Sequence, residues 1–303
     1  MSGRAEAADR RFERVAIIGV GLIGGSFALA LKQQRLAGHI TGCGRNAEHL
    51  ARGVALGVID DYSTSVQEAV RGADLVLLAM PVGASQAVFE AMAGQLAPET
   101  IITDAGSTKA SVIRAAQAAF GAVPPRFVPG HPVAGTEQSG VEAAFPTLFE
   151  GRRVILTPLE QTDMQAVSAV RALWQAVGAD VVDMDADHHD EVLAATSHLP
   201  HLLAYSLVDT LARMAERREV FEYAAGGFAD FSRIASSSPD MWVDIAEGNR
   251  DALLSVLDDY LGGLNRLRAD IDNGRWAEVR QLFARAKLAR DGFVERVGRQ
   301  ADH

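Results

Sequence analysis

The chain is 303 residues long, with 48% apolar and 22% charged residues, 28 glycines and 10 prolines. This composition is typical of a globular protein with about two domains, and it excludes a mostly disordered or collagen-like chain. Acidic residues number 39 against 29 Lys and Arg, which gives a net charge of −10. Such a surface argues against a nucleic-acid partner, because phosphate neutralisation needs clustered cations. One buried cation could still hold an anionic small substrate.

The cysteine count and the N-terminal residues indicate a cytoplasmic protein. The single cysteine, Cys43, cannot form an internal disulfide, so nothing in the sequence requires an oxidising compartment. Residues 1–14 are polar and charged and lack the apolar core of a secretory signal. No run approaches about 18 uncharged apolar residues, so we expect neither a transmembrane helix nor a membrane partner.

The first half of the chain alternates short apolar runs with amphipathic segments. The predicted strands are Val15–Ile18, Ile40–Cys43, Leu75–Ala79, Ile101–Thr103, Phe127–Val128 and Val154–Leu156. The predicted helices between them are Ser26–Gln34, Ala84–Leu96, Lys109–Ala119 and Asp163–Val177. Apolar strands joined by helical crossovers are typical of a parallel sheet covered on both faces. Residues 1–184 are therefore predicted to form an α/β, Rossmann-like domain.

The pattern changes after Asp183, where strand signals end and helical patterns continue to the C-terminus. Residues 249–271 carry leucines and valines near helical spacing, which is typical of a core or a seam between helices. We expect residues 185–303 to form an all-helical domain for substrate binding or dimerisation. No linker rich in Pro or Gly separates the two parts, so we expect them to be tightly docked.

The hexapeptide GVGLIG, residues 19–24, follows the first predicted strand and leads into the first predicted helix. Gly19 permits a tight turn, Gly21 lets a pyrophosphate approach the backbone, and Gly24 allows the helix to pack closely on the strand. The helix N-terminus then offers free N–H groups to the phosphates. In this context we expect Gly19, Gly21, Leu22, Ile23 and Gly24 to bind a dinucleotide. The alternative is a glycine-rich turn without a ligand.

The end of the second predicted strand bears on the choice between NAD and NADP. An Asp or Glu there usually accepts hydrogen bonds from the ribose hydroxyls of NAD. This chain instead has Gly44, Arg45 and Asn46 after Cys43, and we expect these three residues to bind the cofactor. A guanidinium at Arg45 can pair with a 2′-phosphate, so we expect NADP to be preferred and NAD also to be used. Alternatively, Arg45 is solvated or stacks on the adenine.

Two segments after predicted strands carry polar side chains suited to catalysis. Ser107 lies where a strand leads into a helix, at the edge where open α/β sheets bind ligands; simple helix capping is the alternative. His131 lies on a predicted loop after Phe127–Val128. A neutral imidazole there could act as a general base, although it could equally be a hydrogen-bonded loop histidine.

The helical half contributes further candidates. Ser197, His198 and His201 open a helical segment, but no matching Cys, His or carboxylate set follows, so we expect no metal site. Arg233 could hold a substrate carboxylate through two hydrogen bonds, with Asp230 fixing its orientation. The alternative is an intramolecular ion pair between the two.

Taken in order, the motifs GVGLIGGS, DAGSTK, GHPVAGTEQSG, SHLPHLLAYSL and GGFADFSRIASSSPDMW resemble the prephenate/arogenate (cyclohexadienyl) dehydrogenase family of tyrosine biosynthesis. The resemblance covers nearly the whole chain from Arg14. It implies a nicotinamide-binding domain followed by a helical domain that forms most of a homodimer interface, with the active site between them. It further implies oxidative decarboxylation of prephenate to 4-hydroxyphenylpyruvate, or of arogenate to tyrosine.

The resemblance also implies roles for individual residues. His131 matches the catalytic histidine that hydrogen-bonds the ring hydroxyl of the substrate, and Ser107 matches the serine that supports both. Arg233 matches the arginine that holds a substrate carboxylate, with Asp230 as its partner. The remaining matches are substrate contacts of the helical domain and of the site's mouth: Ser197, His201, Thr136 and Glu137.

Two other functions remain open from the residues alone. A β-hydroxyacid dehydrogenase would share the two-domain organisation, and Lys109 would then be its candidate catalytic residue. A non-catalytic dinucleotide sensor would need no base, so the co-occurrence of His131, Ser107 and Arg233 argues against it. Activity on prephenate or arogenate, with none on short hydroxy acids, would distinguish the resembled family from a β-hydroxyacid dehydrogenase, and reduction of the dinucleotide with prephenate would exclude a sensor.

Overall fold

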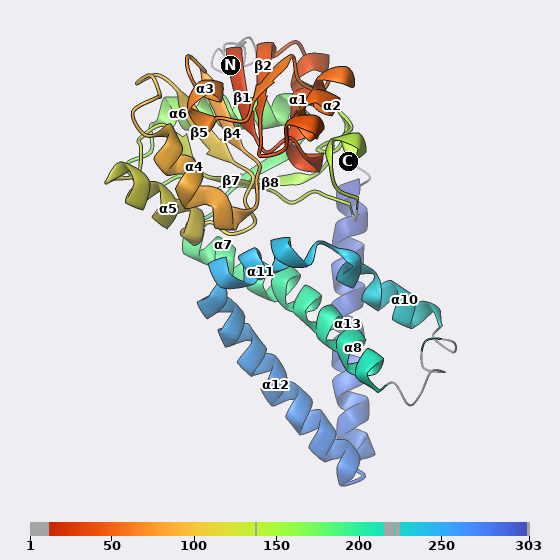
Figure 1. Cartoon of the computed structure of the whole chain (residues 1–303). Helices are drawn as coiled ribbons and strands as arrows, with labels where there is room; N and C mark the ends of the chain where they lie inside the picture. The colour runs from red at the N-terminus through yellow and green to blue at the C-terminus, as the bar shows by residue number, and fades with distance from the viewer. Residues whose placement is uncertain (1–11, 137, 215–220, 222–224, 302–303) are drawn as a thin grey trace. The chain divides into compact units, whose positions relative to one another are not determined.

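The computed structural model describes residues 12–136, 138–214, 221 and 225–301 (Figure 1). By compactness the chain divides into two units, Met1–Arg250 and Asp251–His303. Compactness thus groups residues 185–250 with the α/β part, whereas the predicted boundary at residue 184 marks the change from alternating strands and helices to helices alone.

The first unit is built on a six-stranded sheet. Its strands are β1 (Phe12–Ile18), β2 (Ala37–Cys43), β3 (Asp61–Ser63), β4 (Leu75–Leu78), β5 (Ile101–Asp104) and β6 (Phe127–Val128). They lie in the order β3-β2-β1-β4-β5-β6, and every pairing is parallel. This is the Rossmann order, which confirms the predicted α/β fold. The order reverses between β1 and β4, so the carboxyl ends of these strands mark the expected ligand site.

Alternate residues of each strand pack on opposite faces of this sheet, because successive side chains of a strand point in opposite directions. Val15 and Ile17 face a core shared with α1 (Leu22–Gln33) and α6 (Met164–Ala176), whereas Ala16 and Ile18 face the other core. The helices of that second core are α3 (Val66–Ala69), α4 (Ser85–Met92) and α5 (Ala110–Phe120). Figure 1 shows the resulting layers of helix, sheet and helix.

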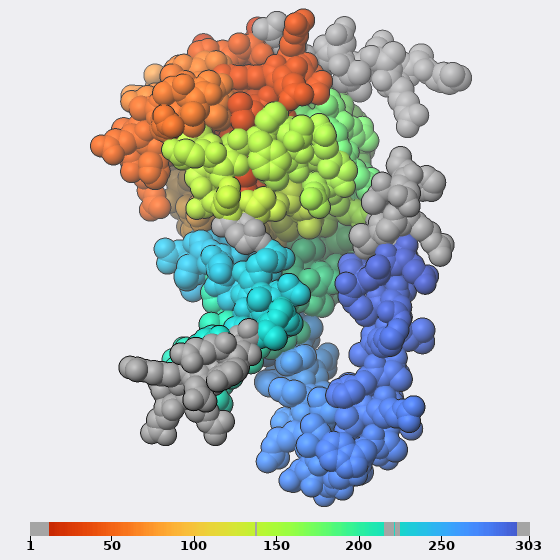
Figure 2. Space-filling model, turned by 90° about the vertical axis from the view of Figure 1, so that its right-hand side faces the viewer, coloured from red at the N-terminus to blue at the C-terminus, as the bar shows by residue number. Residues whose placement is uncertain are grey.

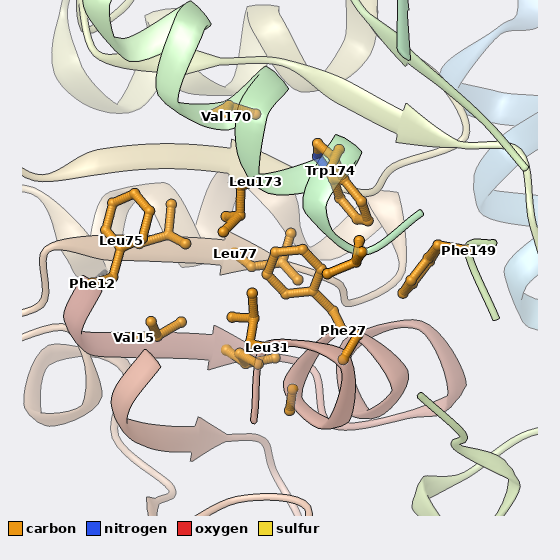
Figure 3. Close-up of a cluster of buried hydrophobic side chains, with 14 of the residues drawn as sticks. Phe12, Val15, Phe27, Leu31, Leu75, Leu77, Phe149, Val170, Leu173 and Trp174 are labelled. Atoms are coloured by element: carbon orange, nitrogen blue, oxygen red, sulfur yellow. The ribbon is translucent and has the colours of Figure 1, made fainter. Parts of the chain in front are cut away.

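An aromatic cluster joins α1 to α6 in the first core (Figure 3). The ring of Trp174 lies 4.6 Å from that of Phe27 and 5.0 Å from that of Phe149, and all three side chains are fully buried. Truncating one such ring typically costs about 3–5 kcal/mol. The cluster holds α1 against the sheet and thereby fixes the glycine turn that precedes α1.

A second sheet of three strands lies beside the first: β7 (Gly130–Pro132), β8 (Arg153–Leu156) and β9 (Asp180–Asp183). β7 is antiparallel to β8, and β9 is parallel to it. His131 pairs with Ile155, so the prediction of a loop at His131 was wrong. β3, β7 and β9 are short, and they carry glycine, proline or acidic residues instead of an apolar run. They therefore leave no periodic signal in the sequence.

The other α-helices that the structure describes in the first unit are α2 (Ala47–Ala55), α7 (Ala186–Leu193), α8 (Leu199–Arg213), α10 (Gly226–Ser232) and α11 (Pro239–Gly248). The π-helical turn η3 (Ala194–His198) joins α7 to α8, and the 3₁₀ turn η4 (Arg233–Ser236) follows α10. α11 contacts the turn η1 (Val82–Ala84) after β4, where the amide of Gly83 donates to Asp244 Oδ2 at 3.2 Å. This contact ties α11 to the carboxyl edge of the sheet.

Two predicted helix boundaries need correction. α1 begins at Leu22 instead of Ser26, because Gly21 already adopts the extended N-cap conformation. α4 ends at Met92 instead of Leu96, and Gly94 beyond it has a φ of +76°.

The second unit consists of the long helices α12 (Arg250–Asp272) and α13 (Trp276–Ala301), with Gly274 in the turn between them at a φ of +66°. Large apolar side chains are exposed along both helices, among them Leu261, Leu264, Phe283 and Leu288. Within the described part of the chain, no helix combines the length and apolarity needed to cross a membrane.

Candidate active site

The turn between β1 and α1 has the shape that the glycine motif predicts. Gly19 has a φ of +101°, and a Cβ there would lie 2.5 Å from the carbonyl oxygen of Ala79. A Cβ on Gly24 would lie 2.1 Å from the Gly19 oxygen, so only glycine fits at either position. At Gly21, by contrast, a Cβ would have no neighbour within 4 Å. The turn is thus tight where it packs and open where a ligand would approach the backbone.

The N-terminus of α1 is suited to an anion. Its first turn has no side-chain cap and no acidic residue. The amides of Leu22, Ile23 and Gly24 lie in this first turn, where N–H groups have no acceptor within the helix. They present donors and the positive end of the helix dipole. The residues present therefore fit the pyrophosphate of a dinucleotide.

The segment after β2 gives weaker evidence for cofactor binding than the sequence does. The Asn46 side chain caps α2, accepting from the amides of Glu48 at 2.9 Å and His49 at 3.2 Å. Arg45 is exposed. A Cβ on Gly44 would lie 3.6 Å from Leu50, an ordinary contact. The structure thus assigns Asn46 a local capping role and leaves Arg45 exposed at the surface.

A buried ion pair holds the backbone around His131. Lys109 and Asp104 form it, and their side chains are 0% and 2% exposed. Lys109 Nζ also donates to the carbonyl oxygen of Gly130 at 2.5 Å, and Asp104 Oδ1 accepts from the Gly130 amide at 2.9 Å. Burial lowers the pKa of Lys109, which the carboxylate of Asp104 opposes. The pair therefore fixes both polar groups of the residue that precedes His131.

His131 belongs to a buried chain of three side chains. Its Nδ1 lies 2.9 Å from Nε2 of His189, and Nδ1 of His189 lies 2.8 Å from Oδ1 of Asp190. The two oxygens of Asp190 also accept from the backbone amides of Lys109 at 2.8 Å and Ala110 at 3.0 Å. Asp190, on α7, thus caps the N-terminus of α5, which has no side-chain cap of its own.

The surroundings of His131 favour a neutral imidazole. Burial, followed by the nearby His189, Lys109 and His198, holds its pKa well below the ordinary 6.5. Among the described residues no hydrogen bond engages its Nε2, and this atom is not one of the fully buried polar atoms without a partner. His131 can therefore offer a lone pair to a ligand at neutral pH.

Ser107 lies in the segment between β5 and α5, two residues before Lys109, and is half-buried. It does not cap α5: this helix has Lys109 at its N-cap, and Asp190 accepts the first amides. The hydroxyl of its neighbour Thr108 is paired with Ser111. The capping alternative for Ser107 is thus not what the structure shows.

The helical candidates surround Trp242 of α11. The ring of His201 stacks on Trp242 at 3.7 Å, and His201 Nδ1 donates to the Ser197 carbonyl at 2.8 Å. His198 is buried, and its Nδ1 accepts from Nδ2 of Asn249 at 3.1 Å. Burial lowers the pKa of His198 to about 4. No cluster of three metal-ligating side chains occurs in the part of the chain that the structure describes.

The other predicted substrate contacts lie at the surface. Arg233 and Asp230 are exposed, and neither takes part in the hydrogen-bond network that the described residues form around His131. Thr136 is exposed and accepts from the amide of Gln138, whereas Glu137 lies outside the described residues.

Figure 2 shows the yellow-green segment after β7 beside the red and orange N-terminal half. There the amide of Phe145 donates to Ser26 Oγ at 3.0 Å.

Sequence reasoning missed most of the network that positions His131. His189, Asp190 and Asn249 were not singled out, and Lys109 was considered only for another enzyme class. In the sequence, a neighbouring His and Asp on an amphipathic helix only weakly indicate a functional site, because their hydrogen-bond partners belong to distant segments. Asn249 Nδ2, for example, donates to the backbone oxygen of Asp190 at 2.7 Å.

Comparisons with known proteins match both halves of the chain to one family. Residues 27–183 match the family "Prephenate dehydrogenase, nucleotide-binding domain", and residues 185–285 match "Prephenate dehydrogenase, dimerization domain". The chain is 40% identical over 282 residues to the cyclohexadienyl dehydrogenase of Zymomonas mobilis, covering 92% of this chain and 95% of that protein. It is 38% identical over 290 residues to the prephenate dehydrogenase of Bacillus subtilis, covering 93% and 76%.

A solved structure shares the whole fold. The crystal structure of prephenate dehydrogenase from A. aeolicus, in complex with hydroxyphenyl propionate and NAD+, superposes with a TM-score of 0.85 at 36% identity. The match covers 92% of this chain and 97% of that one. Both domains, the glycine turn and the overall architecture therefore lead to one conclusion: the chain belongs to the prephenate dehydrogenase family.

Proposed function

We propose that this chain catalyses the oxidative decarboxylation of prephenate to 4-hydroxyphenylpyruvate with a nicotinamide dinucleotide, and that arogenate is a second substrate. The observation that carries the proposal is His131, a buried imidazole whose pKa burial holds well below 6.5 and whose Nε2 makes no hydrogen bond to any described residue. It lies on β7, which contacts β5 next to the carboxyl edge of the dinucleotide-binding sheet. The A. aeolicus relative, which holds NAD+ and hydroxyphenyl propionate, supports this assignment.

Oxidative decarboxylation of prephenate requires one base for the hydroxyl proton and one cation for a substrate carboxylate. A nicotinamide dinucleotide whose pyrophosphate is held at Gly19–Gly24 would accept the hydride from the ring carbon that carries the hydroxyl. Nε2 of His131 accepts the hydroxyl proton as that C–O bond gains double-bond character. His131 returns the proton to the oxygen once loss of CO₂ has made the ring aromatic. Ser107 supports the hydroxyl and the imidazole, and Arg233 holds a carboxylate with Asp230 as its orienting partner.

The remaining contacts complete the proposed site. Ser197 and His201 bind the substrate from the helical side, and Thr136 and Glu137 line its mouth. Lys109 is disfavoured as the catalytic residue of a β-hydroxyacid dehydrogenase. Its ammonium is 0% exposed and already occupied by Asp104 and the Gly130 carbonyl.

The base is tested by His131→Asn, with His39→Asn as the control. His39 is a surface residue of β2, near the end of that strand opposite the predicted ligand site. Loss of a general base typically costs about 10²–10⁴-fold, so kcat should fall by that factor with a smaller change in KM. A His131→Asn enzyme within a few-fold of the parent rate, with chemistry rate-limiting, would exclude the role.

For the cofactor we propose a preference for NADP over NAD. Gly44 can neither accept hydrogen bonds from the ribose nor repel a 2′-phosphate, and the exposed Arg45 can pair with that phosphate. A charge-assisted hydrogen bond contributes about 1.5–3 kcal/mol, which corresponds to a ten- to hundredfold preference.

The cofactor proposal is tested with kcat/KM for both dinucleotides in the parent, Arg45→Ala and Gly44→Asp. Arg45→Ala should lose the NADP preference. Gly44→Asp should favour NAD, because the position has room for a side chain beside Leu50. A parent that strongly prefers NAD, together with unchanged NADP use by Arg45→Ala, would contradict the proposal.

We also propose a homodimer formed through residues 185–303. The match to a dimerization domain and the exposed apolar side chains of α12 and α13 support it. Leu264→Glu or Phe283→Glu should shift the mass measured by light scattering from dimer toward monomer. Met164→Glu on α6, an exposed apolar position outside this region, is the control. A parent that is a monomer at micromolar concentration would refute the proposal.

A further inference from the structure

His189 has no part in the chemistry proposed above, yet it is the only described side chain within hydrogen-bond distance of the His131 ring. It is fully buried and lies between Nδ1 of His131, at 2.9 Å, and Oδ1 of Asp190, at 2.8 Å. The sequence of contacts is therefore imidazole, imidazole and carboxylate. In such a chain each group decides which atom of the next one carries a proton.

The order of protons starts at Asp190. Burial alone would raise the pKa of this carboxyl group, but hydrogen bonds from His189 and from the amides of Lys109 and Ala110 lower it below 3.8. An ionised carboxylate is only an acceptor, and backbone N–H groups are only donors. The proton between Asp190 and His189 must therefore lie on Nδ1 of His189.

The same argument continues to His131. A neutral His189 that carries its proton on Nδ1 has an unprotonated Nε2, which can only accept. Nδ1 of His131 must then be the donor of the 2.9 Å hydrogen bond. The single proton of a neutral His131 is thereby placed on Nδ1, and its Nε2 keeps the lone pair.

We propose that His189, anchored by Asp190, is a positioning residue that sets the tautomer of His131 and so makes Nε2 the base. The inference rests on the proposed role of His131. His131 then keeps the same hydrogen bond when it takes up a proton, because its Nδ1–H goes on donating to His189. The negative charge of Asp190 stabilises the imidazolium through His189, as in other carboxylate–histidine pairs.

The anchor itself is rigid. Asp190 is held by the amides of Lys109 and Ala110 at the N-terminus of α5 and, at its backbone oxygen, by Asn249, the C-cap residue of α11. The other charged or titratable groups near His131 are Lys109, paired with Asp104, and His198. Neither Lys109 nor His198 makes a hydrogen bond to the His131 ring in the described structure, so the tautomer depends on His189.

The tautomer is measured directly by NMR of the ligand-free enzyme labelled with ¹⁵N-histidine. At pH 8, above the ordinary histidine pKa of about 6.5, the proton of His131 should be on Nδ1. The signal is assigned by its loss in His131→Asn. A proton on Nε2 of His131 would overturn the proposal.

Kinetics give the second test, with His189→Met and His189→Gln. Methionine removes both hydrogen bonds, so kcat should fall about 10- to 100-fold with KM within about threefold. Glutamine can still accept from His131 and donate to Asp190, so it should recover much of that loss. His188→Gln, at the exposed neighbouring position, should match the parent.

The outcomes separate this inference from the proposed function. If kcat falls equally in His189→Met and His189→Gln, in proportion to the fall in their melting temperatures, His189 has a merely structural role and the inference is overturned. If His131→Asn is inactive but the proton lies on Nε2, only the role of His189 falls. If His131→Asn stays active, His131 is not the base and both proposals fall.

Discussion

The buried His198 should make the stability of the fold depend on pH. It is 1% exposed, and its Nδ1 accepts from Asn249. Burial, opposed by Asp190 and reinforced by His189 and His201, lowers its pKa to about 4. The unfolded chain titrates near the ordinary 6.5, so between these two values the unfolded state binds more protons than the native state. Stability should therefore be complete above pH 6.5 and be lost as the pH falls toward 4.

The magnitude follows from the difference between the two pKa values. At 1.36 kcal/mol per unit, the gap from 6.5 to about 4 corresponds to roughly 3 kcal/mol in total. At pH 5 about 2 kcal/mol of this should already be lost relative to pH 7. Burial also lowers the pKa of His131 and His201, which act in the same direction, so the parent should lose more than His198 alone explains.

The assay compares urea unfolding of the parent and His198→Gln at pH 7 and pH 5. Protein concentration is held constant, because oligomerisation changes apparent stability. Glutamine keeps an acceptor for Asn249 but does not titrate, so the variant should lose about 2 kcal/mol less than the parent. Equal losses in both proteins would refute the argument that His198 is buried in its neutral form.

Three further predictions concern the ion pair, the substrate and the base. Lys109→Met leaves Asp104 buried without its cation and should lower the free energy of unfolding by about 3–5 kcal/mol. Lys32→Met, which breaks the surface pair with Asp60, should lower it by less than about 1 kcal/mol, and similar losses in the two variants would contradict the role of the buried pair. Arg233→Ala should raise KM about tenfold to a hundredfold, since the substrate carboxylate would lose a charge-assisted hydrogen bond of about 1.5–3 kcal/mol; an unchanged KM would remove Arg233 from the substrate site. The acid limb of kcat/KM should lie below pH 6.5, because the pKa of His131 is lowered and only its neutral form accepts a proton; a limb above pH 6.5 would be inconsistent with this.

The features that the sequence predicted well depend on local rules. The glycine spacing at residues 19–24 reflects contacts within one turn, and the structure shows why Gly19 and Gly24 admit no side chain. The apolar runs of β1, β4 and β5 are buried on both faces, so each gives a continuous signal. Five ordered motifs then identified the family without any tertiary information.

The features that the sequence did not predict depend on distant partners. Asp190 caps α5 from 80 residues away, and His189 meets His131 across 58 residues. β7 is a strand only because β8 pairs with it, since its own residues, glycine, histidine and proline, have no strand periodicity. Asn46 was predicted to bind the cofactor, but its side chain accepts hydrogen bonds from the free backbone amides at the start of α2.

The most direct test is an assay of the purified protein with prephenate and each nicotinamide dinucleotide. Reduction of the dinucleotide should be accompanied by equimolar CO₂ and 4-hydroxyphenylpyruvate, and His131→Asn should remove the activity by about 10²–10⁴-fold. The contrary result would be reduction of the dinucleotide with short hydroxy acids and none with prephenate or arogenate.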